Sequence, residues 1–220
     1  MRLARLVTTL AASGAALLAA AVAFSHGGAE AATGSLREET TVYRYTDKPF
    51  AAAMTGSRVY AVYVDQAFDA AERERVALAL RQWNHVLNGF VQLRPLLLPS
   101  NASDRTLAQL RRSGAWIVLK VDNRHPAARD AAALAVTAGG RGGGFVYVIA
   151  DRFAMRDLTA VMLHEVGHVL GAGHDPEGHL MAPFYDRSNG HCIDRGAVAM
   201  VASAQRLPLT QLNWCVGPGL

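Results

Sequence analysis

The sequence has little charge, no long basic run and no internal repeat, and each shortage excludes a class of protein. Charged residues make up 18% of the 220 residues and hydrophobic residues 51%, which excludes a disordered or acidic solvating chain. The net charge is +4, but the longest basic run is the pair Arg111 and Arg112, so nucleic-acid binding is not expected. The absence of short repeats argues against a solenoid. The length suits one ordinary domain, or two small lobes that share a cleft.

The first 31 residues have the three parts of a secretory signal peptide in order. A positive start (Arg2 and Arg5) precedes an uncharged apolar stretch (6–24) and a small-residue cleavage site (Ala29-Glu30-Ala31, or alternatively Ala21-Val22-Ala23). We therefore expect a secreted or extracytoplasmic protein. The alternative is an uncleaved anchor, because the apolar stretch can just span a bilayer, and membrane contact is expected only in that case.

Cysteine is scarce, since Cys192 and Cys215 are the only two. In an exported protein, two cysteines most simply form one disulfide. The alternative is a pair of free buried thiols, which would suit a cytosolic protein.

After the leader, residues 32–57 have no sustained hydrophobic period and indicate an irregular extension or a short pro-segment. Residues 58–220 then alternate between strand and helix patterns. Strands are predicted at 58–64, 90–98, 116–121, 134–138 and 145–150, and helices at 69–87, 107–112, 157–169 and 194–205. The glycine-rich run 139–144 predicts a hairpin connection. It is not a phosphate loop, because no lysine followed by serine or threonine is present and a strand follows it.

The segment 164–175 reads HEVGHVLGAGHD and contains the candidate metal ligands and the candidate general base. His164 and His168 are four residues apart, so on a helix their imidazoles reach one point, and two such ligands suit Zn²⁺. Gly171 allows the sharp turn that brings His174 back as a third nitrogen ligand. The pattern therefore predicts one zinc ion per chain.

Glu165 follows the first of these histidines and is displaced by about 100° around the helix, so it flanks the metal without binding it. This suits a carboxylate that takes a proton from water activated by the metal. Three protein ligands leave a fourth position open, which is typical of a catalytic site. The alternative is a zinc site that only stabilises the fold.

This motif, HExxHxxGxxH, resembles that of the metzincin metalloproteases at every fixed position. Residues 180–185, LMAPFY, are similar to the methionine turn of that family, and their M-x-P-x-Y form is nearest to the matrixins. The resemblance implies that Met181 lies beneath the metal as an apolar base. It also implies that Pro183 and Tyr185 help to wall the pocket for the residue after the scissile bond, and Phe184 between them is expected to border it. Such a wall offers apolar contact and no buried charge, so we expect a preference for bulky apolar side chains.

The resemblance further implies an α+β, metzincin-like fold with a twisted five-stranded mixed sheet and two long helices, the second of which carries the metal ligands. The expected N-terminal subdomain is 58–173. A small C-terminal subdomain, 174–220, would hold the methionine turn, a helix and the disulfide. Strand 134–138 would be the antiparallel edge strand that pairs with an extended substrate.

The chain also departs from the matrixin pattern. No cysteine precedes Cys192, so the cysteine switch that keeps matrixin zymogens latent is absent. His125 and Asp130 lie in the loop where matrixins hold a second zinc, but the other two histidines are missing. We therefore expect no structural zinc, and calcium binding is left open.

Together these features predict a secreted, monomeric zinc endopeptidase that acts on peptides or proteins with Glu165 as general base. Two alternatives remain. One is a zinc-containing binding protein without turnover, and the other is a peptidase with a single dedicated partner substrate.

Overall fold

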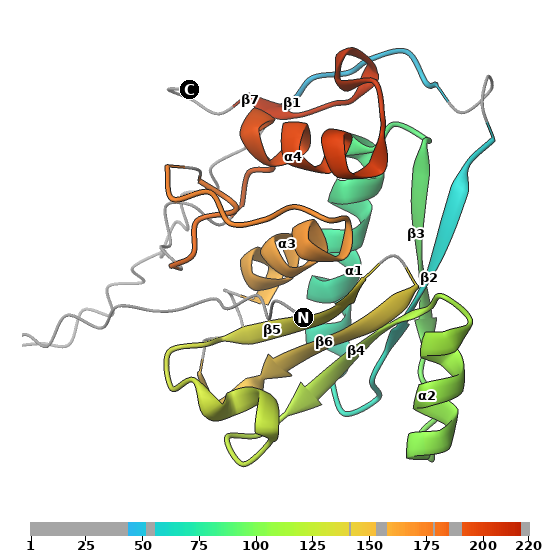
Figure 1. The fold of residues 1–220 in the computed structure, drawn as a ribbon, viewed down its shortest axis with the longest axis vertical. Coiled ribbons are helices and arrows are strands. Elements are labelled where there is room, and N and C mark those ends of the chain that lie inside the picture. Colours follow the sequence, from blue (N-terminus) through green and yellow to red (C-terminus); the bar gives the residue numbers. More distant parts are fainter. Residues whose placement is uncertain are drawn as a thin grey trace, which may run out of the picture. The chain divides into compact units, whose positions relative to one another are not determined.

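A five-stranded mixed sheet forms the centre of the fold (Figure 1). The computed structural model describes residues 44–51, 56–140, 142–152, 158–177, 179–184 and 191–216, all of which belong to one compact unit. The strands are β2 (Arg58–Val64), β3 (Val91–Leu97), β4 (Trp116–Val121), β5 (Ala135–Gly140) and β6 (Gly143–Ile149). Their order is β3-β2-β4-β6-β5, and only the edge strand β5 is antiparallel to its neighbour. The predicted α+β fold with a five-stranded mixed sheet is confirmed.

Helices cover both faces of this sheet. The helices are α1 (Ala70–Val86), α2 (Asp104–Arg112), α3 (Leu158–Val169) and α4 (Arg195–Gln205), with short 3₁₀ turns η1 (Pro126–Arg129), η2 (Ala150–Arg152) and η4 (Leu209–Gln211). The crossovers through α1 and α2 run in opposite directions along the sheet, so right-handed connections put these helices on opposite faces. Helix α3 packs on α1 and contacts β5 (Figure 1). The indole nitrogen of Trp83 donates a hydrogen bond of 2.9 Å to the Leu163 carbonyl, which joins α1 to α3.

Capping side chains decide where two of the helices begin. At α1 the predicted capping box is present, with Asp69 accepting from the Glu72 amide at 2.9 Å and Glu72 accepting from the Asp69 amide at 2.8 Å. Helix α2 begins three residues earlier than predicted, because the Ser103 hydroxyl accepts from the amide of Thr106 and caps it. The predicted cap of α3, Asp157, lies outside the described residues.

The glycine-rich run is a hairpin, as predicted, but more of it is strand than expected. Strands β5 and β6 continue into the run, where Gly139 pairs with Gly144. A Cβ atom at either glycine would lie within 3 Å of the Trp116 ring. The glycines are therefore required because the Trp116 side chain packs directly against the hairpin backbone.

A second, two-stranded sheet joins the beginning and the end of the described chain. Strand β1 (Arg44–Tyr45) pairs antiparallel with β7 (Cys215–Val216), and the Cys192–Cys215 disulfide lies beside this pair. The sequence did not predict either strand. Residues 44–48, which the sequence assigned to an irregular extension, therefore hydrogen-bond to the end of the domain.

The expected signal peptide lies outside the described residues. Among the helices that the structure describes, none combines the length and hydropathy needed to cross a bilayer.

Candidate metal centre

Three histidines converge at the C-terminal end of α3. His164 and His168 lie one turn apart on this helix, as their spacing predicted. The helix ends at Val169, and Gly171 then adopts a φ of +98°, so the chain reverses and brings His174 back. One ring nitrogen from each histidine lies within 4.8 Å of the others, a grouping able to hold a metal ion.

Backbone carbonyls fix the orientation of two of these rings. Nδ1 of His164 donates to the Leu180 carbonyl at 2.7 Å, and Nδ1 of His168 donates to the Ala172 carbonyl at 2.9 Å. Because a carbonyl can only accept, the proton of each neutral ring is on Nδ1 and the lone pair is on Nε2. These carbonyl partners are not detectable in the sequence, since any residue supplies one.

The electrostatics of the histidine cluster fit a cation. Burial, followed by the charge of His168, lowers the pKa of His164 to about 3, and burial lowers the pKa of His168 to about 4. Both rings are therefore neutral near pH 7, yet their Nε2 atoms lie only 3.0 Å apart. Two lone pairs at this distance repel each other unless a positive ion binds both. Neutral imidazole is also the form that coordinates Zn²⁺, so these residues fit zinc.

Glu165 is fully buried beside this cluster, and its two oxygens differ in their contacts. Oε2 accepts a hydrogen bond of 2.5 Å from the Thr137 hydroxyl of β5. Oε1 is buried and has no hydrogen-bond partner among the described residues. Burial raises the pKa of Glu165 to about 8, while the Thr137 hydrogen bond lowers it. The carboxyl group therefore has one oxygen held by Thr137 and one oxygen without a partner among the described residues.

Met181 packs against the helix that carries His164 and His168. Its side chain is fully buried, and Gly167 leaves room for it, because a Cβ at Gly167 would lie 2.5 Å from the Met181 sulfur. The Met181 carbonyl accepts from the amide of Asp175, the residue after His174, at 2.9 Å. The turn at Leu180 and Met181 thus holds both the His164 ring and the chain just after His174.

The residues expected to border a substrate pocket are only partly described. Pro183 is half-buried and Phe184 is 52% exposed, while Tyr185 lies outside the described residues. A different cleft, of about 690 Å³, opens beside the histidines between β5 and the 171–174 turn. Neither Pro183 nor Phe184 is among the described residues that line it. The assignment of these residues to the substrate pocket therefore stays a prediction.

Comparison with known protein families places most of the site inside a family match. The family model described as Matrixin matches residues 67–198, which is more than half of the chain. The matched region includes all three histidines, Glu165 and Met181. The comparison with curated proteins finds no match.

Proposed function

The chain belongs to the matrixin family, whose members are zinc-dependent peptidases, and from this premise we propose that it is a secreted zinc endopeptidase with Glu165 as general base. Family membership indicates a metalloprotease that hydrolyses peptide bonds in peptides or proteins. Three parts of the proposal go beyond family membership: the roles of individual residues, cleavage at internal peptide bonds, and export from the cytoplasm.

His164, His168 and His174 would hold one zinc ion, because their ligand nitrogens converge and the rings of the first two are held neutral. A zinc ion bound there supplies Lewis-acid chemistry, polarising a carbonyl and making water more acidic. Three histidine ligands would leave one position of a tetrahedral site for a reacting group.

The observation that carries the proposal is the unpartnered Oε1 of Glu165. This oxygen is buried, belongs to the residue next to a ligand, and has no partner among the described side chains. A buried carboxylate oxygen without a partner is costly to maintain, and a role in proton transfer explains it. The positive charge of a metal held by the three histidines would lower the pKa of Glu165 and so favour the charged form that accepts a proton. The same group can later return that proton to the leaving amine.

The edge strand β5 supports binding of an extended peptide. An edge strand has unpaired backbone groups that can hydrogen-bond to another strand. Thr137 of this strand contacts Glu165, so a peptide aligned on β5 would pass close to the carboxylate. An extended segment held along its backbone is the substrate of an endopeptidase.

Export is supported by the composition of residues 1–31 and by the disulfide between Cys192 and Cys215. Disulfides form and persist in oxidising compartments. Sequencing the N-terminus of the protein recovered outside the cytoplasm tests this part of the proposal, with Ala32 expected as the first residue.

The proposed activity is tested with denatured casein. We expect the purified protein to cut casein internally, and a zinc chelator such as 1,10-phenanthroline to abolish the cleavage, as followed by mass spectrometry of the products. The matched control is Glu165→Gln, which should retain zinc but lose about 10²–10⁴-fold in rate. A zinc-loaded wild-type protein that cuts neither casein nor a peptide library would refute the peptidase assignment. Equal rates for wild type and variant would refute the role of Glu165.

A further inference from the structure

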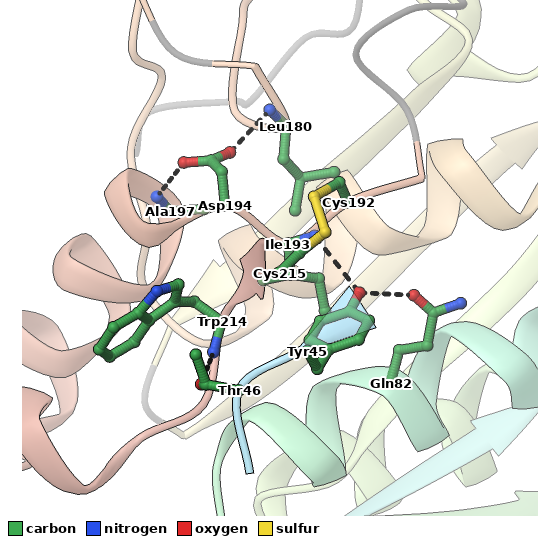
Figure 2. The surroundings of a disulfide bond; sticks show 10 residues. All are labelled: Tyr45, Thr46, Gln82, Leu180, Cys192, Ile193, Asp194, Ala197, Trp214 and Cys215. Carbon is green, nitrogen blue, oxygen red and sulfur yellow. Dashed lines mark hydrogen bonds between the residues drawn. A yellow bond between two sulfur atoms is a disulfide. The ribbon is translucent and has the colours of Figure 1, made fainter. Parts of the chain in front are cut away.

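The peptide groups of Leu180 join the metal centre to the region of the disulfide. The Leu180 carbonyl accepts from Nδ1 of His164 at 2.7 Å. The Leu180 amide donates to Oδ2 of Asp194 at 3.1 Å (Figure 2). The position of the carbonyl that orients the first ligand therefore depends on Asp194.

Asp194 is a buried carboxylate with both oxygens engaged. It is only 7% exposed, and its Oδ1 accepts from the Ala197 amide at 3.0 Å, which caps α4 (Figure 2). One side chain thus fixes two parts of the backbone at once, the beginning of α4 and the methionine turn.

The disulfide and its neighbours hold the segment that carries Asp194. Cys192, two residues earlier, is bonded to Cys215, and the Cys215 amide donates to the Ile193 carbonyl at 2.9 Å. The Ile193 amide donates to the Tyr45 hydroxyl at 3.4 Å, and that hydroxyl donates to Gln82 of α1 at 2.9 Å (Figure 2). The backbone just before Asp194 is therefore tied covalently to β7 and by hydrogen bonds to β1 and α1.

We propose that the Cys192–Cys215 disulfide acts through Asp194 to position the zinc ligand His164, so that zinc affinity depends on the disulfide. A hydrogen bond to the second nitrogen of a ligating histidine fixes its tautomer and ring orientation, and losing such a partner weakens metal binding. Without the disulfide, the segment before Asp194 gains freedom, Leu180 is held less firmly, and the His164 ring loses its fixed orientation. This inference rests on the proposed zinc site, but not on peptidase activity.

The first test compares zinc dissociation constants, measured by competition with a chelating dye. Asp194→Asn should weaken zinc binding about tenfold. Asparagine caps a helix as well as aspartate does, but it cannot accept from both amides, because one oxygen is replaced by an NH₂ donor. The double variant Cys192→Ala/Cys215→Ala should show a similar loss. Alanine is used because free thiols and thiol reductants bind zinc themselves.

The matched control is Asp69→Asn, the same substitution at the cap of α1, where Asp69 accepts from the third amide of its helix in the same way. We expect this variant to bind zinc as wild type does. Combining Asp194→Asn with the cysteine substitutions should add little further loss, because both changes break the same connection.

Each outcome decides the proposal. Unchanged zinc affinity in either folded variant would overturn it, and so would an equal loss of affinity in Asp69→Asn. It would also be overturned if the loss of affinity in the combined variant equals the product of the two separate losses.

If the alanine pair does not fold, zinc-loaded wild type is reduced with a thiol-free phosphine, and faster loss of zinc to the dye is expected. An unchanged rate after complete reduction overturns the proposal. A wild type that binds zinc tightly but cleaves nothing would refute the proposed function alone.

Discussion

The hydroxyl of Thr137 donates a hydrogen bond of 2.5 Å to Oε2 of Glu165, across 28 residues of sequence. Thr137 belongs to the edge strand β5, and Glu165 to the helix α3 that carries two of the histidines. The strand that we expect to align the substrate therefore also orients the carboxylate. The other oxygen of Glu165 has no partner within the described residues.

Thr137→Val should reduce kcat/KM about 10- to 100-fold, because it removes a hydrogen bond to a charged group without changing the shape of the residue. The Thr137 hydrogen bond lowers the pKa of Glu165, so its loss raises that pKa and moves the acid limb of the pH–rate profile to higher pH. Thr137→Ser keeps the hydroxyl and serves as the control. The role of Thr137 is contradicted if the valine variant loses activity with no shift of the acid limb.

Burial of Glu165 should destabilise the metal-free protein progressively as the pH rises from 4.5 to 8, whereas the buried histidines, whose pKa values are lowered, act in the opposite direction up to about pH 6.5. The ordinary pKa of this side chain is 4.5, and burial raises it to about 8 in the fold. Between these values the unfolded chain releases the proton and the folded chain keeps it, so rising pH favours unfolding. Glu165→Gln has no proton to release but keeps the histidines, so the free energy of unfolding of wild type minus that of the variant, measured with urea, should fall as the pH rises from 4.5 to 8. A difference that stays constant with pH would show that Glu165 is not buried as described.

His168→Ala should remove most of the bound zinc, because it deletes one of the three converging nitrogens. Metal content of the purified variant, measured by atomic emission, checks this. The control is His179→Ala, since this exposed histidine lies close in sequence but is not part of the group. If the His168→Ala protein still holds one zinc ion per chain, the assignment of His168 as a zinc ligand is wrong.

Gly167→Ala should lower the free energy of unfolding by about 1–3 kcal/mol, because the new Cβ would overlap the buried sulfur of Met181. Gly173→Ala is the control, since a Cβ there meets nothing within 4 Å. Denaturant unfolding of the zinc-free proteins measures both. Equal stability of the two variants would mean that Met181 can move aside at no cost.

Features that depend on neighbouring residues were predictable from the sequence. The spacing of His164 and His168 determines that both face one point, since helix geometry alone relates residues four apart. Gly171 predicted the reversal that returns His174 to the site, and the structure has a left-handed glycine there. The capping box at Asp69 and the positions of the five strands along the chain were also predictable, because cap and turn signals act over a few residues.

Only the tertiary structure decided which groups meet across long stretches of chain. The pairing of Thr137 with Glu165, of Leu180 with His164 and of β1 with β7 depends on how separate elements pack. The Leu180 contact uses a backbone carbonyl and the β1–β7 contact uses backbone pairing, and no particular residue type in the sequence indicates either of them. Asp194 illustrates the limit well: the sequence predicted the start of a helix there, which is local, but not the second hydrogen bond to Leu180. A side chain's local partner follows from chain geometry, whereas its distant partner is fixed only when the whole core packs.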